Sequence, residues 1–199
     1  MSERQEADEL VEGALTDASV LQSTIEELSG PSRRSRQNAA QIIAAVAKRD
    51  AQLVLPFADD LIDALNRPEA QTRWECLDAL TCLVDIGSRS CDKALAGAEA
   101  SLFDEDNGPV RLAAMRFLCK LGATTESRSE KIWPLINEGI QCYHGDLEFQ
   151  DMLVAVIGFS EGKLSAAVKK SLAERMEFDA ANSKGALKSR AQQIIGNVS

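Results

Sequence analysis

The sequence predicts an all-α protein made of repeated helical hairpins, and three observations support this. Strict alternation of apolar and polar residues, which marks a half-buried strand, is almost absent from the 199 residues. Apolar residues instead recur at spacings of three and four, as in Cys76, Leu77, Leu80 and Leu83. Turn signals rich in Gly, Pro and Asn interrupt this pattern at intervals of about 37 to 39 residues, which indicates a repeat protein.

The predicted turns fall between amphipathic helices, where residues that restrict or free the backbone end one helix before the next begins. They are Ser29-Gly30-Pro31, Asn66-Arg67-Pro68, Asn107-Gly108-Pro109, His144-Gly145-Asp146 and Asn182-Ser183-Lys184-Gly185. A residue a few positions after each turn serves as the anchor of a repeat. The anchors, at separations of 37, 38, 38 and 39 residues, are Arg36, Arg73, Arg111, Phe149 and Lys188.

Apolar residues follow each anchor at offsets of three, four, seven and ten, which predicts one buried stripe on the second helix of every repeat. Only Gln192 breaks the stripe, in the last repeat, where an outer flank is usually polar. The column at offset seven is expected to be buried and consists of Ile43, Leu80, Leu118, Val156 and Ile195. A first helix precedes the second one, including residues 53–65, 94–103, 132–142 and 164–178, so each repeat is a helical hairpin.

With these repeats the chain resembles HEAT-type α-solenoids. The segment LVLPFADDLIDALNRPEAQTRWECLDALTCLVDIG has the cadence of that family, with Pro56 in a Leu-rich first helix, Pro68 in the turn and Arg73 at the start of the second helix. The segment DNGPVRLAAMRFLCKLG repeats it, and Pro134 stands before Phe149 much as Pro56 stands before Arg73. The resemblance covers residues 15–199 and implies a right-handed α-α superhelix, a HEAT-like (HEAT/armadillo-like) solenoid of about five hairpins. Phe149 departs from the basic residue expected at its position.

Charge is concentrated at the start of the chain. Residues 1–30 carry eight acids and one base, a local net charge of −7 out of −9 for the whole chain. We therefore expect an acidic segment over 1–14, whose order the sequence leaves open, followed by a single solenoid domain over 15–199. A globally acidic chain repels phosphate backbones, which disfavours a nucleic-acid partner. The dense basic run Arg33, Arg34 and Arg36 is interpreted as a solvated turn and first helical turn.

Compartment and redox state follow from the termini and the cysteines. The start MSERQEADELVEG lacks the basic and apolar segments of a secretory signal, and no apolar run approaches the roughly 20 residues that span a bilayer, so the sequence predicts a cytoplasmic protein without a membrane segment. The five cysteines are odd in number and form no CxxC pair, which predicts reduced core thiols without a disulfide or zinc site. They are Cys76, Cys82, Cys91, Cys119 and Cys142.

No catalytic constellation emerges from the motifs. The sequence has neither a GxGxxG nor a GxxxxGK[ST] string, and its single histidine, His144, is expected to be an exposed turn residue. The acidic clusters at 59–63 and 104–106 lack EF-hand spacing and are expected to be solvated surface. We therefore expect no enzyme, no cofactor and no metal site.

The candidate binding residues lie at offsets one and five on the second helices, which the resemblance places on a concave surface. These rows read Gln37, Trp74, Leu112, Gln150 and Gln41, Asp78, Arg116, Val154. Trp74 and Leu112 are expected to be neighbours, with Asp78 and Arg116 beside them, and an aromatic anchor with mixed charges is typical of a binding hot spot. The other interpretation is that Trp74 is ordinary core; Trp133 is expected to be core or convex-face packing.

The leading functional hypothesis is a non-enzymatic scaffold or adaptor that binds a protein or peptide through Trp74, Asp78, Leu112 and Arg116. The alternative is a nucleic-acid-processing enzyme or lyase on the same scaffold, as some HEAT-like DNA glycosylases and phycobilin lyases are. A glycosylase needs a basic face with aromatic residues and a catalytic acid. The candidates for such a face are Arg73, Trp74, Asp78, Arg111, Arg116 and Lys120. The partner's identity and the oligomeric state are left open.

Overall fold

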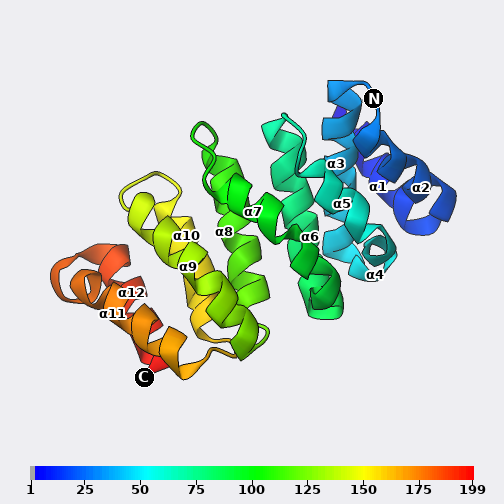
Figure 1. Ribbon diagram of the computed structural model, residues 1–199. Coiled ribbons are helices and arrows are strands. Elements are labelled where there is room, and N and C mark those ends of the chain that lie inside the picture. Colours follow the sequence, from blue (N-terminus) through cyan, green and yellow to red (C-terminus); the bar gives the residue numbers. More distant parts are fainter. Residues whose placement is uncertain (1–2) are drawn as a thin grey trace. The chain divides into compact units, whose positions relative to one another are not determined.

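The computed structural model describes residues 3–199, with side chains from Asp8 onward, and these residues form helices joined by short turns, without any strand (Figure 1). The chain divides into two compact units, unit 1 (Met1–Ser101) and unit 2 (Leu102–Ser199). The prediction of an all-α fold is confirmed.

Unit 1 begins with three helices that pack on one another, and side-chain caps define where they start. Asp17 accepts a hydrogen bond from the Ser19 backbone N–H and Ser32 accepts one from Ser35, as N-cap residues do. The elements of this unit are α1 (Glu3–Thr16), α2 (Ala18–Glu26), η1 (Glu27–Ser29), α3 (Arg33–Arg49), α4 (Ala51–Val54), η2 (Leu55–Phe57), α5 (Ala58–Ala64), α6 (Ala70–Cys91) and η3 (Asp92–Ala94), and α7 (Leu95–Leu102) ends at the boundary.

The second repeat departs from regular hairpin geometry at two positions. Pro56 lies in a 3-10 turn that divides its first helix into α4 and α5, because proline lacks the N–H that an α-helix requires. Within α6, Gly87 has φ −149° and ψ 40°, which kinks the helix. A Cβ added at Gly87 would lie 2.3 Å from Cδ1 of Leu55, so glycine lets η2 approach the kink closely.

Unit 2 is a run of longer helices with the same capping chemistry. Thr125 and Ser165 accept hydrogen bonds from the backbone N–H groups of Arg128 and Val168. They are the N-cap residues of α9 and α11, the first helices of two repeats. The helices are α8 (Gly108–Gly122), α9 (Glu126–Cys142), α10 (Phe149–Ser160), α11 (Ala166–Asn182) and α12 (Gly185–Val198). The predicted turns all fall at helix ends, in agreement with the turn signals in the sequence.

The repeat alignment holds for four of the five residues in the offset-seven column. Ile43, Leu80, Leu118 and Val156 are fully buried on α3, α6, α8 and α10. The expectation for Ile195 is wrong, because this side chain is half-buried and Ile194 is buried instead. Helix α12 packs on α10 and α11 through a narrower stripe of buried residues, Ala191, Ile194 and Val198.

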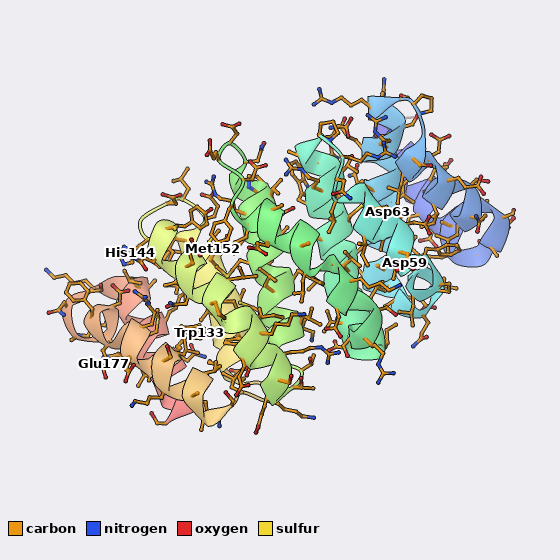
Figure 2. The ribbon with its side chains drawn as sticks, viewed as in Figure 1. Asp59, Asp63, Trp133, His144, Met152 and Glu177 are labelled. Atoms are coloured by element: carbon orange, nitrogen blue, oxygen red, sulfur yellow. The ribbon has the colours of Figure 1, made fainter. Side chains whose placement is uncertain are left out.

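The core of unit 2 is aromatic. Phe117, Phe149 and Phe159 are among its largest fully buried side chains. The ring of Trp133, labelled in Figure 2, stacks on Phe159 with centroids 6.3 Å apart and an interplanar angle of 6°. Its indole N–H donates to Oγ of Ser171 at 3.0 Å, which satisfies the one polar atom of the side chain. The expectation that Trp133 is packed rather than free is confirmed.

Anchor arginines tie successive repeats together in both units. Arg36 on α3 pairs with Glu69, the N-cap residue of α6. Arg111 on α8 pairs with Glu148, the N-cap residue of α10, at 2.7 Å. Both carboxylates lie near a helix N-terminus, where the macrodipole also favours negative charge. The arginine at the repeat anchor is therefore a structural feature of this fold.

The pair in unit 1 should make stability depend on pH. Glu69 is only 5% exposed, and the hydrogen bond from Arg36 lowers the pKa of its carboxyl below the usual value. Because the folded-state pKa is lowered, the pair stabilises the protein fully at pH values above the unfolded-state pKa of about 4.3. This stabilisation is lost as the pH falls through the folded-state pKa. Glu69→Gln should therefore destabilise the protein at neutral pH, and its deficit against wild type should shrink below about pH 4.

Urea unfolding followed by circular dichroism at neutral and acidic pH checks this dependence. Glu99→Gln, which neutralises an exposed carboxylate on α7, is the matched control and should track wild type throughout. If Glu69→Gln lost the same stability relative to wild type at all pH values, the contribution of the pair would come from packing rather than from charge.

Candidate functional site

In unit 1 the candidate residues lie on α6, next to the second helix of the preceding repeat. Trp74 and Asp78 are both half-buried, one turn apart, while the intervening Cys76 and Leu77 are fully buried. Trp74 is thus neither ordinary core nor fully outward. On α3, Gln37 is half-buried and Gln41 is exposed.

A small charged cluster surrounds Trp74. Burial raises the pKa of the Glu75 carboxyl, and a hydrogen bond from Trp74 acts in the opposite direction. Asp78 raises the same pKa further through its charge, whereas Lys48 on α3 lowers it. Nζ of Lys48 lies 3.8 Å from Oδ2 of Asp78. One ammonium therefore faces two carboxylates beside a half-exposed indole ring.

In unit 2 the corresponding positions lie on α8 and α10, which pack side by side. Leu112 is half-buried and Arg116 is exposed. On α10, Val154 is 50% exposed, and the amide oxygen of Gln150 accepts a hydrogen bond from Arg190 of α12. This face carries the cation of Arg116 and exposed apolar area. The expected adjacency of Trp74 and Leu112 joins residues of the two units and stays a prediction.

Arg111 points into the protein rather than toward a ligand. Besides Glu148 it lies 3.6 Å from Asp146, and its Nη1 donates to the backbone oxygens of Asp104 and Glu105. Its guanidinium carbon lies 4.9 Å from the centre of the Tyr143 ring, and the Tyr143 hydroxyl donates to the Leu102 backbone oxygen at 2.7 Å. The basic face that the glycosylase alternative requires therefore loses one of its members.

The sequence interpretation missed a polar contact in unit 2. Nε2 of His144, labelled in Figure 2 and lying in the turn between α9 and α10, is 3.1 Å from Oδ1 of Asp179 on α11. Asp179 is only 5% exposed and also accepts a hydrogen bond from Oγ of Ser183. A cleft of about 350 Å³ borders this pair, and Phe178 at its edge is 72% exposed. His144 is exposed as expected, but it also links two repeats.

The acidic clusters serve the fold. Asp59, on the exposed side of α5 (Figure 2), pairs with Lys93 at 2.9 Å. Asp104 accepts hydrogen bonds from the backbone N–H groups of Asp106 and Asn107, which closes the turn before α8. Among the residues that the structure describes, no group of three metal-ligating side chains is suitably placed for a metal ion.

All five cysteines are thiols, but they do not share one environment. Cys76, Cys91 and Cys119 are buried, and burial raises the pKa of the Cys76 and Cys119 thiols far above the usual range. Cys82 is half-buried and Cys142 is exposed, so the expectation of a core position is wrong for Cys142, at the end of α9.

In the described part of the chain, no helix is long and apolar enough to cross a membrane.

Comparison with known proteins identifies the fold and leaves the activity open. No protein-family model matches the sequence, and the search of curated proteins found no match. A designed armadillo repeat protein in complex with the peptide (KR)4 superposes with a TM-score of 0.77 at 13% identity, over 98% of this chain and 92% of that one. A computationally designed armadillo repeat protein for modular peptide recognition gives 0.72 at 14% identity, with the same coverage.

A natural protein shares the architecture as well. The HEAT-like repeat protein of the archaeon Thermococcus onnurineus NA1 superposes with a TM-score of 0.61 at 18% identity, over 96% of this chain and 92% of that one. The fold is therefore a HEAT/armadillo-like solenoid, as the repeat spacing and the resemblance predict. Folds of this kind host many functions, so the site has to supply the functional argument.

Proposed function

We propose that this chain is a non-enzymatic interaction scaffold that binds a protein or peptide through its second helices. Unit 1 contributes Trp74 and Asp78, and unit 2 contributes Leu112 and Arg116. The observation that carries the proposal is the half-buried indole of Trp74 beside the carboxylates of Glu75 and Asp78. Large aromatic side chains at partly exposed positions with charged neighbours are the usual anchors of protein interfaces.

The chemistry around Trp74 suits a partner segment with lysine or arginine side chains. A cation is attracted both to the face of an indole ring and to nearby carboxylates. The net charge of −9 adds a general attraction for basic partners. One structurally similar designed protein holds the peptide (KR)4, which supports this choice for unit 1. In unit 2, Arg116 and Val154 suit an acidic or apolar segment instead.

The alternative of a nucleic-acid-processing enzyme finds less support. Arg111 is held by Glu148 and Asp146, and the carboxylates of Glu75 and Asp78 occupy the place where a glycosylase-like site would need net positive charge. Retention on heparin at low salt distinguishes the two functions. We expect the protein to elute without binding, and retention comparable to a DNA-binding protein would favour the alternative.

Trp74→Ala tests the proposed site. A partner is first obtained by affinity purification with the wild-type chain and then titrated in purified form against wild type and variant. We expect a loss of at least about 2 kcal/mol in binding, roughly thirtyfold in affinity, because hot-spot tryptophans have effects of this size. Since Trp74 is half-buried, its loss should cost only about 1 kcal/mol in stability.

One control and a second variant of the site make the result decisive. Ile86→Ala changes an exposed apolar residue on the same helix and should leave the affinity unchanged within about twofold. Asp78→Asn keeps the size of the side chain, and it should weaken the binding of a basic partner and make that binding less sensitive to salt. Unaltered binding by Trp74→Ala at full stability would remove this residue from the site.

A further inference from the structure

A second surface, distinct from the candidate residues of α6, lies in unit 1 where α1, α2 and α3 pack on one another (Figure 1). They enclose an open groove of about 440 Å³. Its apolar lining comes from all three helices and comprises Leu10 of α1, Val20 of α2, and Ala39 and Ile42 of α3. Ala39 and Ile42 are buried and form the floor, whereas Leu10 is 49% exposed at the side.

The rim of the groove is polar but mostly small and uncharged. Ser19, Ser23, Thr24, Ser35 and Asn38 line it together with one carboxylate, that of Glu27. The hydroxyl of Thr24 donates to the Val20 backbone oxygen and that of Ser19 donates to Asp17, so these groups are satisfied within the protein. The groove therefore offers apolar contact rather than an array of directed hydrogen bonds.

The charge in and before the groove is mainly acidic, and Glu27 is the charged residue of its lining. From Asp8 to Ser32 the chain has six acids and no lysine or arginine. Asp8 and Glu9 precede Leu10 and are exposed, and Glu27 lies in the lining itself. The basic side chains nearest in sequence are Arg33 and Arg34, beside Ser35. An apolar floor with an acidic surround is complementary to a segment that is apolar on one face and basic on the other.

From this complementarity we infer that the groove between α1, α2 and α3 binds a basic amphipathic helix of a partner protein. The walls are helices, so they have no open sheet edge to which an extended strand could add. A helix can instead insert apolar side chains spaced three and four residues apart over Leu10, Val20 and Ile42, while its basic residues lie near Glu27 in the lining. A second copy of this chain carries a net charge of −9 and is repelled by the same acids.

A synthetic probe tests this inference without knowledge of the natural partner. The probe is a fluorescein-labelled peptide of about 18 residues, five helical turns, with leucines on one face and lysines on the other. Two comparison peptides have the same leucines with glutamate in place of lysine, and the leucine-lysine composition in scrambled order. Fluorescence anisotropy at about 50 mM and 200 mM salt then measures their affinity for the full chain.

We expect the leucine-lysine helix to bind the wild-type protein at least about tenfold more tightly than either comparison peptide, and less tightly at high salt. Leu10→Asp and Ser23→Arg each change an exposed or half-exposed lining residue and should weaken this probe at least about tenfold. Ile86→Asp, at a 40% exposed position on α6 outside the groove, should leave the affinity unchanged within about twofold.

Several results would overturn the inference. Equal binding of the scrambled peptide, or unchanged binding by Leu10→Asp, would reduce the effect to general charge attraction. A doubled mass of the wild-type protein in light scattering that Leu10→Asp returns to the monomer would make a second copy the occupant. Loss of probe binding in Trp74→Ala but not in Leu10→Asp would place the peptide on the second-helix face, whose own function is tested separately.

Discussion

Replacing Phe159 with alanine is expected to lower the free energy of unfolding of unit 2 by about 3 to 5 kcal/mol. Phe159 is fully buried, stacks on Trp133, and packs against Gly122 so closely that a Cβ there would lie 2.9 Å from its Cε2. Truncation removes the aromatic stacking partner and leaves a cavity that the rigid helices α8, α9 and α10 fill only in part. Urea unfolding followed by circular dichroism measures the loss.

Phe178→Ala is the matched control, because it removes the same side chain from the surface of the same unit. Phe178 is 72% exposed, so its loss should change stability by no more than about 0.5 kcal/mol. A similar loss for both variants would mean that the burial assigned to these helices is wrong. If Phe159→Ala had no effect, the aromatic core of unit 2 would not be the one described here.

The fold could be predicted because burial repeats along the chain. The offsets that bury Ile43, Leu80, Leu118 and Val156 depend only on one helix packing on its predecessor and successor, and that environment recurs every 37 or 38 residues. The same argument failed at Ile195. Helix α12 buries the narrower stripe through Ile194, and it packs mainly on α10 and α11.

The exposure of the candidate site was only partly accessible from the sequence. Helical periodicity gives the direction of Trp74 relative to the buried stripe, but the depth of its indole depends on Glu75 beside it and on the helix packed next to α6. Arg111 shows the limit more clearly. Its offset marks it as a repeat anchor, yet its inward orientation depends on an ion pair with Glu148 at the start of the next repeat, and the apolar pattern does not specify that side-chain contact.

Contacts between distant positions escaped the sequence analysis for the same reason. His144 and Asp179 are 35 residues apart, and nothing in either local pattern indicates that the turn after α9 meets the end of α11. The groove of unit 1 draws its lining from three helices, each with an ordinary amphipathic pattern. The acidic composition of residues 1–30 was visible in the sequence, but its relation to an apolar groove required the packing of α1 on α2 and α3.

Arg111→Ala is expected to destabilise the protein by about 2 to 4 kcal/mol. Removing one member of a buried ion pair leaves its partner charge uncompensated, which typically costs 3 to 5 kcal/mol, and the partial exposure of Arg111 and Glu148 reduces this somewhat. The backbone oxygens of Asp104 and Glu105 lose their donor as well, and Tyr143 loses a stacked cation. The turn before α8 and the start of α10 should therefore loosen together.

Arg116→Ala provides the comparison within the same helix. Arg116 is exposed, so its removal should change stability by no more than about 0.5 kcal/mol while weakening an acidic partner of unit 2. The double variant Arg111→Ala/Glu148→Gln should recover part of the loss seen in Arg111→Ala, because the unpaired carboxylate is gone. Chemical denaturation of the three variants measures all these differences.

The two arginines thus separate the structural role from the binding role on one helix. If Arg111→Ala leaves stability unchanged and instead abolishes binding of a phosphate-bearing ligand, Arg111 belongs to a site and the nucleic-acid alternative gains its first support. If Arg116→Ala is the destabilising variant, the inward and outward faces of α8 are reversed. Neither Arg116 nor Leu112 would then belong to the proposed interface. A loss confined to Arg111→Ala and partly reversed by Glu148→Gln would show that the repeat anchor holds α8 to α10, which leaves Leu112 and Arg116 to meet the partner.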